Sequence, residues 1–254
     1  MIMQQYGKVQ VQVFETRNAM GESATHQAAE ALRQALAQQE KISCIFAAAP
    51  SQNEFLEALI AEPGIDWKRV TACHMDEYVG LPLEDTHSFG HFLKNSIFDR
   101  VPFGEVHFIN GCADPVEECA RYSELLHELK PEFVFMGIGE NGHIAFNDPP
   151  VANFQDRASV KVVMLEERCR CQQVHDGCFP SLQDVPTHAF TLTIPALMNC
   201  SQVFCVVPGE RKAQAVQDAM LGPVETDCPA SILREHPNAK LYLDKESAAL
   251  LFKH

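Results

Sequence analysis

Short runs of apolar and β-branched residues alternate along the chain with longer segments in which apolar residues recur at helical spacing. The short runs have the length and composition of buried strands. They cover residues 9–14, 42–48, 70–75, 133–138, 188–194, 202–207 and 240–244. The longer segments predict amphipathic helices, because their apolar residues fall on one helical face. They cover residues 22–40, 51–62, 115–130 and 209–221.

This alternation is typical of an α/β fold, in which a mainly parallel sheet is covered by helices on both faces. The sequence contains no internal repeat, no low-complexity tract and no long linker. A chain of 254 residues is long enough to bury a substantial core. We therefore expect residues 1–254 to form a single domain.

The charge and the cysteine content narrow the classes of partner and compartment. The 34 acidic and 20 basic residues give a formal charge of −14, which argues against nucleic acid or an anionic membrane surface as a partner. No segment has the roughly 18 consecutive apolar residues of a membrane span, and the first residues do not have the pattern of a signal peptide. The ten cysteines include no C-x-x-C pair, so we expect free thiols, no metal site and a cytoplasmic location.

Three polar stretches lie at the ends of predicted strands, where ligands of parallel α/β sheets bind. They are AAAPSQNE at the end of the strand 42–48, MDEYVGL at the end of the strand 70–75, and GENGHIAFND after the strand 133–138. The chemistry of the protein is therefore expected in these stretches.

The third stretch belongs to a G-x-G-x-x-G pattern formed by Gly137, Gly139 and Gly142. A dinucleotide site needs a helix directly after such a loop, because the N-terminus of the helix receives the pyrophosphate. Here two prolines follow Gly142 within eight residues and prevent a helix of useful length. The acidic residue expected about 20 positions later at a strand end is also missing. We therefore reject a dinucleotide cofactor at this loop.

The same loop contains Glu140, Asn141, His143, Asn147 and Asp148 within nine residues. These side chains can cap their own backbone in a tight polar turn. Alternatively, His143 and Asp148 form an acid–base pair, in which the carboxylate fixes the imidazole tautomer and stabilises the imidazolium. The composition of the loop is compatible with both interpretations.

Asp76 and Glu77 directly follow the strand 70–75. Because neighbouring side chains of an extended segment point to opposite faces, only one of them can face the same cavity as the glycine loop. Such a residue is either an ordinary strand-end carboxylate or, if burial raises its pKa, a base that abstracts a proton from a carbon next to a carbonyl.

Taken together, these motifs resemble a known family of sugar-phosphate enzymes. MDEYVGL, HSF at residues 87–89 and GIGENGHIAFNDP resemble the glucosamine-6-phosphate deaminase/isomerase family, which is similar in fold to the 6-phosphogluconolactonases. The lactonase branch typically has G-x-D-G-H-x-A-S in the glycine loop, so GHIAFN is more similar to the deaminases. The resemblance implies a modified Rossmann-like fold without a dinucleotide site.

The resemblance further implies that an amino-sugar 6-phosphate is isomerised and loses ammonia to give a ketose 6-phosphate, without a metal or organic cofactor. Asp76 would move the C2 proton to C1, and His143 would open the pyranose ring with the help of Asp148. Two positions depart from the common pattern. Asn141 replaces the Asp of many members and can only orient its neighbours, and Asp148 is one methylene shorter than the usual Glu.

A phosphate site is also implied, and here the chain departs further from the family. The usual T-G-G/S-T/S-P loop is replaced by AAAPSQ at residues 47–52, so the glycines that let backbone amides approach a phosphate are missing. Ser51 is either an anion ligand or the first residue of a Ser-x-x-Glu capping box with Glu54. Lys212 and Arg170 are either phosphate ligands or solvated surface charges. The candidate substrate- and phosphate-binding residues are Ala48, Ala49, Ser51, Gly139, Arg170 and Lys212.

Three functions follow as alternatives. The first is an amino-sugar-phosphate isomerase/deaminase that acts on glucosamine 6-phosphate or galactosamine 6-phosphate. The second is lactone hydrolysis with His143 activating water. The third is a phosphosugar sensor without turnover, against which the presence of Asp76, His143 and Asp148 argues, because binding alone needs no acid–base groups. The family includes monomers and hexamers, so a homo-oligomer is a further expectation.

Overall fold

The computed structural model describes residues 1–252. Its main sheet has eight strands in the order β1-β2-β11-β10-β7-β3-β4-β6. β1 is antiparallel to β2, and the other neighbouring pairs are parallel. The α/β class and the mainly parallel sheet are therefore confirmed. The strands are β1 (Ile2–Tyr6), β2 (Val9–Phe14), β3 (Ile42–Phe46), β4 (Val70–His74), β6 (Glu105–His107), β7 (Phe133–Met136), β10 (Gln202–Val207) and β11 (Ala239–Asp244).

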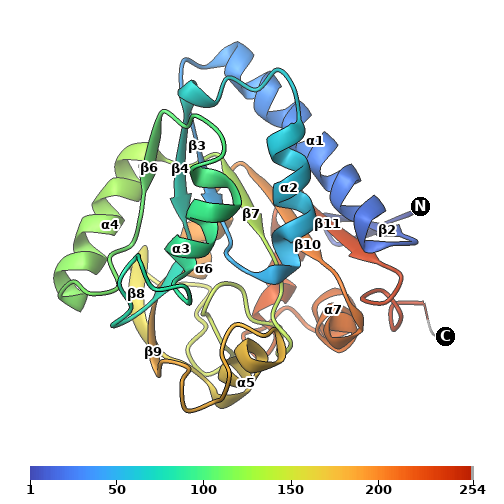
Figure 1. Cartoon of the computed structure of the whole chain (residues 1–254). Coiled ribbons are helices and arrows are strands. Elements are labelled where there is room, and N and C mark those ends of the chain that lie inside the picture. The colour runs from blue at the N-terminus through green and yellow to red at the C-terminus, as the bar shows by residue number, and fades with distance from the viewer. Residues whose placement is uncertain (253–254) are drawn as a thin grey trace.

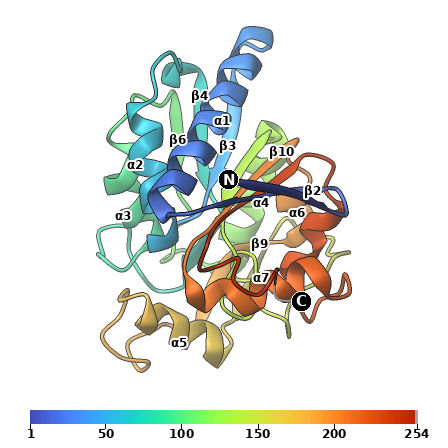
Figure 2. The same cartoon turned by 90° about the vertical axis from the view of Figure 1, so that its right-hand side faces the viewer.

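Helices cover both faces of this sheet. They are α1 (Arg17–Gln38), α2 (Asn53–Ala61), α3 (Phe89–Leu93), α4 (Pro115–Leu129), α5 (Glu167–His175), α6 (Ile194–Met198) and α7 (Ala213–Leu221). Short 3₁₀ turns lie at Pro50–Gln52, Trp67–Arg69, Glu210–Lys212 and Pro229–Glu235, and a π turn lies at Lys94–Phe98. Figure 2 shows α1 and α2 on one side of the sheet and α6 and α7 on the other.

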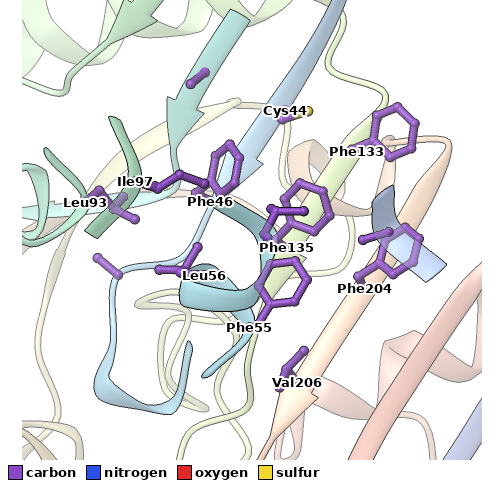
Figure 3. Close-up of a cluster of buried hydrophobic side chains, with 14 of the residues drawn as sticks. Cys44, Phe46, Phe55, Leu56, Leu93, Ile97, Phe133, Phe135, Phe204 and Val206 are labelled. Atoms are coloured by element: carbon purple, nitrogen blue, oxygen red, sulfur yellow. The ribbon is translucent and has the colours of Figure 1, made fainter. Parts of the chain in front are cut away.

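The core has two parts because side chains of a strand alternate between the two faces. In β7, Phe133 and Phe135 pack with α1 and α2, whereas Val134 and Met136 pack with α4 and α7. On the first face an aromatic row crosses three neighbouring strands, as Figure 3 shows. Phe135 lies 5.0 Å from Phe46 on β3 and 5.6 Å from Phe204 on β10, measured between ring centroids. These cross-strand contacts fix the register of the strands that carry the site.

A separate antiparallel sheet has the order β5-β9-β8, with β5 (Asp76–Tyr78), β8 (Val160–Met164) and β9 (His188–Leu192). The strand expected at 188–194 is β9, so its apolar run was found but it does not join the parallel sheet. The pattern of the sequence did not predict β1, β5, β6 or β8, and each of these is an edge strand. Edge strands are short or polar because only part of their surface is buried.

The helix boundaries follow from local capping. α1 begins five residues before the expected position, because the Thr16 side chain accepts a hydrogen bond from the Ala19 N–H at 3.2 Å. α4 begins at Pro115 as predicted, with Asp114 as its N-cap. Within residues 1–252, no helix combines the length and the apolar character needed to cross a bilayer.

The carboxyl ends of β3, β4 and β7 are neighbours in the sheet. In Figure 1 they point toward the bottom of the view, where α5 and the strands β8 and β9 lie. The fold therefore brings together the ends of three strands that are far apart in the sequence, and it covers them with the segment after β8.

Candidate active site

A pocket lies where the three polar stretches of the sequence meet. Its wall comes from the chain after β3, the junction of β4 and β5, the glycine loop after β7, one side of α5 and the start of α7. Among the residues predicted for the site, those that line the pocket are Ala48, Ala49, Ser51, Asp76, Gly139, His143 and Lys212. Asn141 and Asp148 lie behind His143 and contact its ring. Arg170 does not line the pocket.

Asp76 and Glu77 have different surroundings, as expected from the alternation in an extended strand. Asp76 lines the pocket. The Glu77 carboxylate instead accepts hydrogen bonds from the Ser88 hydroxyl (2.7 Å) and from the backbone N–H groups of Phe89 (3.1 Å) and Gly90 (2.8 Å). Glu77 therefore fixes the N-terminus of α3. Asp76 is the carboxylate of this pair that faces the pocket.

The carboxylate of Asp76 is buried and receives no hydrogen bond from a residue within 1–252. Burial raises its pKa well above the ordinary value, and the charge of Glu77 adds to this effect. When the ionised carboxylate takes up a proton, it loses no hydrogen bond, because no group within residues 1–252 donates one to it. This is the environment of a general base.

His74 holds the backbone that carries Asp76. Its Nε2 accepts the Ile109 N–H at 2.9 Å, so its Nδ1 carries the ring proton and donates to the Asp76 carbonyl at 2.9 Å. Burial lowers the pKa of His74 to about 4. The ring is therefore neutral near pH 7, which leaves Nε2 free to accept this hydrogen bond.

The glycine loop forms a seat for His143. A Cβ built on Gly139 would overlap the His143 imidazole. The loop is closed by hydrogen bonds from Gly139 N–H to the His143 carbonyl (2.9 Å) and from Gly142 N–H to the Gly139 carbonyl (3.0 Å). Gly142 has a φ of +83°, in the left-handed region that favours glycine. Within residues 137–166 no helix begins, which confirms the prediction that the two prolines after Gly142 prevent a helix there. These two glycines therefore serve to place an imidazole.

Hydrogen bonds around His143 determine which ring nitrogen carries the proton. Asn141 Oδ1 accepts the backbone N–H of His143 at 3.1 Å, which fixes the oxygen of the amide on this side. The same oxygen lies 2.7 Å from His143 Nδ1, and Asp148 Oδ1 lies 3.0 Å from that nitrogen. Two acceptors at Nδ1 require a proton there. In the neutral ring, Nε2 is then unprotonated, and no residue within 1–252 bonds to it.

Asp148 is buried behind His143. Burial acts to raise its pKa, but hydrogen bonds from His143, from Asn141 Nδ2 (3.0 Å) and from the Glu166 N–H (3.2 Å) outweigh burial and hold the pKa below the ordinary value. Asp148 is therefore an anion near neutral pH. It stabilises the imidazolium that forms when His143 Nε2 takes up a proton.

One group of side chains in the described chain has ligand types suited to a metal ion. His143, Asp148 and Cys169 each offer one ligand atom, and these atoms lie within 4.8 Å of one another. Burial raises the pKa of the Cys169 thiol well above its usual value, and the charge of Asp148 adds to this. A metal would bind the thiolate, which this environment disfavours. The donor set therefore fits a hydrogen-bonded acid–base group better than a metal centre.

Lys212 and two backbone amides form the cationic part of the pocket. Lys212 is only 7% exposed, and its ammonium forms no ion pair or hydrogen bond with a residue in the described part of the chain. Burial lowers its pKa, whereas the charges of Asp176 and Glu140 act in the opposite direction. Within the same part, the N–H groups of Ala48 and Ala49 have no acceptor. A buried ammonium without a counter-ion, together with free N–H groups, is suited to an anionic ligand.

Arg170 is engaged elsewhere. Its Nη2 donates to the carbonyls of Leu182 (2.7 Å) and Val185 (2.8 Å), so the guanidinium holds the loop after α5. The phosphate-binding role of Arg170 stays a prediction, and the contacts of its guanidinium give it no support.

The capping box predicted for Ser51 and Glu54 is wrong. Pro50 opens a 3₁₀ turn that delays the start of α2 to Asn53, and no side chain caps this helix. The Glu54 carboxylate instead lies 2.6 Å from Arg17 Nε. The hydroxyl of Ser51 accepts a hydrogen bond from Gln52 Nε2 (3.1 Å), and Ser51 lines the pocket, where it is available to a ligand.

Several residues of the site were not predicted from the sequence. Gln52, Gln172 and Gln173 line the pocket, and Gln172 and Gln173 reach it from α5. Glu166, directly before α5, accepts a hydrogen bond from Asn141 Nδ2 at 2.6 Å. The polar segment that contains α5 has no apolar periodicity, so nothing in its pattern indicated that it would cover the pocket. Gln172 and Gln173 indicate a role in the pocket only once the structure shows that both side chains are buried there.

Comparison with known proteins identifies the family. The family model described as glucosamine-6-phosphate isomerases/6-phosphogluconolactonase matches residues 15–242. A glucosamine-6-phosphate deaminase of Listeria monocytogenes is 37% identical over 212 residues, which are 83% of this chain and 88% of that protein. A glucosamine-6-phosphate deaminase of Exiguobacterium sibiricum is 42% identical over 188 residues, which are 74% of this chain and 73% of that protein.

Solved structures agree with this assignment. A monomeric glucosamine-6-phosphate deaminase superposes with a TM-score of 0.85 at 28% identity, and the match covers 94% of this chain and 99% of the other. A 6-phosphogluconolactonase from Thermotoga maritima superposes with a TM-score of 0.76 at 19% identity over 92% and 99% of the two chains, which shows a common fold. The chain belongs to the family of glucosamine-6-phosphate isomerases and 6-phosphogluconolactonases.

Proposed function

We propose that this protein is an amino-sugar-6-phosphate isomerase/deaminase that releases ammonia and forms a ketose 6-phosphate. The observation that carries the proposal is the content of one pocket. It combines a carboxylate without a donor (Asp76), an imidazole whose Nε2 bonds to no residue within 1–252 (His143) and a buried ammonium without a counter-ion (Lys212). The names of the deaminase relatives support the same activity.

Ring opening is assigned to His143. Its Nε2 accepts the proton of the anomeric hydroxyl as the bond between C1 and the ring oxygen breaks, and the imidazolium then delivers this proton to the ring oxygen. Asp148 and Asn141 Oδ1 hold Nδ1–H throughout, so the positive charge forms beside an anion. The product is the open-chain amino aldehyde, and no proton is gained or lost overall.

Isomerisation is assigned to Asp76. The carboxylate removes the proton from C2 of the amino aldehyde, whose amine is an ammonium, and returns it to C1. One proton of the ammonium passes to O1, which leaves a hydroxyl at C1 and an iminium at C2. Water then adds to C2, ammonia leaves together with one proton as ammonium, and the C2 ketone of the ketose remains. The raised pKa of Asp76 suits this task, because the residue must hold the proton between the two carbons.

The anionic end of the substrate is assigned to the other wall segments. Lys212 supplies the charge, and the free N–H groups of Ala48 and Ala49 and the hydroxyl of Ser51 supply donors. These groups take over the part that glycine amides would play in the usual loop. They select a phosphosugar over the neutral sugar, because without an anion the ammonium stays buried and unpaired.

Replacing Lys212 should weaken binding more than it slows chemistry. For Lys212→Ala we expect a KM about 10- to 100-fold higher for the phosphosugar with a smaller change in kcat, because charge-assisted hydrogen bonds to the phosphate are lost. Arg170→Ala is the matched control, since it removes a cation that does not line the pocket. It should reduce thermal stability and leave KM within about threefold. Equal KM values for native protein and Lys212→Ala would contradict this assignment of the phosphate site.

The activity itself is tested by incubating the purified protein with glucosamine 6-phosphate and with galactosamine 6-phosphate and measuring the ammonia released. We expect ammonia from one of the two sugars, and a rate about 10²- to 10³-fold lower for His143→Ala. Ammonia from neither sugar, with hydrolysis of 6-phosphogluconolactone that depends on His143, would identify a lactonase instead. Stabilisation by these ligands without any product would identify a sensor.

We also propose a cytoplasmic location, which the ten free cysteines support, because thiols stay reduced in that compartment. A homo-oligomer stays a prediction, and light scattering of the purified protein tests it.

A further inference from the structure

We propose that Glu166 is a positioning residue that orients Asn141 and makes an amide, and not a carboxylate, the side chain required at position 141. The proposal rests on the proposed function only where it concerns turnover. Glu166 does not line the pocket, so it acts through Asn141 and not on the substrate.

The geometry assigns every polar atom of the Asn141 amide. Its Oδ1 accepts two hydrogen bonds from His143, from the backbone N–H at 3.1 Å and from Nδ1–H at 2.7 Å. Its Nδ2 donates to Asp148 Oδ1 at 3.0 Å and to Glu166 Oε2 at 2.6 Å. Both donors and both lone pairs of the amide are used, so the amide cannot rotate without losing all four bonds.

Glu166 therefore controls the proton on His143 from a distance. With the carboxylate of Glu166 on one side, Asn141 must present its NH₂ there and its oxygen to His143. The oxygen keeps the ring proton on Nδ1 and leaves Nε2 unprotonated toward the pocket. An acceptor at position 166 thus fixes the tautomer that ring opening requires.

The same contacts favour an amide over a carboxylate at position 141. A carboxylate at 141 would place an oxygen beside Asp148 and beside Glu166, at the positions where Nδ2 now donates at 3.0 and 2.6 Å. Acceptor would face acceptor at both contacts, and three carboxyl groups would share one partly buried site. The identity of residue 141 is in this way tied to the presence of Glu166.

Glu166 also connects this network to α5. Its backbone N–H donates to Asp148 Oδ2 at 3.2 Å, and the Glu140 N–H donates to Gln172 Oε1 at 2.8 Å. The helix that brings Gln172 and Gln173 to the pocket is therefore held by residues of the glycine loop and by Asp148, through Gln172 and through the residue that precedes the helix. Glu166, directly before this helix, therefore both holds the helix in place and orients the amide that fixes the His143 tautomer.

A double-variant cycle tests the proposal. Asn141→Asp is expected to lower kcat about 30- to 100-fold and Tm by about 4–8 °C, because acceptors face acceptors. Glu166→Gln should stay within about threefold of native kcat, because its amide oxygen still accepts from Asn141. Combining the two reverses the hydrogen bond, since the new glutamine donates to the new carboxylate. The combination should recover at least about tenfold in kcat relative to Asn141→Asp, and part of the loss in Tm, because the contact with Asp148 is not repaired.

Two controls separate positioning from general effects. Asn141→Asp combined with Glu167→Gln makes the same change in charge on the neighbouring exposed residue and should recover neither kcat nor Tm. Glu166→Ala removes the acceptor and should lower kcat about tenfold with KM unchanged, which a purely structural role would not do. If Glu167→Gln rescues as well as Glu166→Gln, the proposal is overturned. The Tm cycle reads the Asn141–Glu166 pair without any substrate, so failure of the proposed function is distinguished from failure of this inference.

Discussion

Asp76→Asn is expected to lower kcat at least about 10³-fold while leaving the affinity for the phosphosugar within about threefold. An amide cannot accept the C2 proton, yet it keeps the size of the side chain and the wall of the pocket. Exchange of the C2 proton with deuterated solvent measures the step directly, and calorimetric titration measures binding. Proton exchange that continues in Asp76→Asn would remove Asp76 from the role of base.

The pH dependence of this step follows from the raised pKa of Asp76. The base acts only when ionised, so kcat should rise with pH through a pKa well above the ordinary carboxyl value of 3.8. Stability moves in the opposite direction. In the window between the two pKa values the native state binds a proton that the unfolded chain has released, so stability falls as pH rises. Asp76→Asn should therefore raise Tm near pH 7 and raise it less near pH 4.

Glu77→Gln is the matched control, because it changes the neighbouring carboxylate on the same strand. Glu77 accepts three hydrogen bonds at the start of α3, and an amide cannot accept them all with its single oxygen. This variant should lose stability, whereas Asp76→Asn gains it. Opposite signs in Tm for the two adjacent positions would verify that one carboxylate is structural and the other faces the ligand.

Gly139→Ala is expected to reduce kcat about 10²-fold or more, although it adds a single methyl group. The added Cβ would occupy the space of the His143 imidazole, so the ring must leave its seat and its bonds to Asn141 and Asp148. Gly137→Ala is the comparison, since its Cβ would meet no atom closer than Gln52 Nε2 at 3.1 Å. It should have a clearly smaller effect, measured as ammonia release.

A double variant shows whether the effect of Gly139→Ala passes through the imidazole. In Gly139→Ala combined with His143→Ala the ring is gone and the added methyl group has room. The combination should be no slower than His143→Ala alone, so the two effects should be strongly non-additive. A further loss in the double variant would mean that the methyl group damages something other than the seat of His143.

The sequence by itself determined those features that depend on interactions between residues close together in the chain. The short apolar runs and the helical patterns predicted the α/β class and every strand in the interior of the parallel sheet, from β2 to β4. Polar residues directly after apolar strands predicted Asp76 and the glycine loop, because the carboxyl ends of neighbouring parallel strands meet at one edge. The two prolines after Gly142 predicted that no helix follows the glycine loop. Each of these features depends on residues close together in the chain.

Only the tertiary structure decided which side chains act together. Ser51 and Glu54 have the spacing of a capping box, but Pro50 and the contact with Arg17 overrode it. The guanidinium of Arg170, a candidate ligand for phosphate, donates to the carbonyls of Leu182 and Val185 in the loop after α5. In each case a tertiary contact, or a shift in where a helix starts, outweighed the local signal.

The same reason explains why Glu166, His74 and Gln173 were missed. Their roles depend on which polar atom is left without a partner after the strands and α5 have packed, and no periodicity records this. The sequence by itself thus predicted that Asp76 and His143 lie at one pocket, since ligands of this fold class bind beside the strand ends. Tertiary packing decided the protonation states, because burial and hydrogen-bond partners shift them: the raised pKa of Asp76 and the proton on His143 Nδ1 both come from neighbours that the chain brings in from elsewhere.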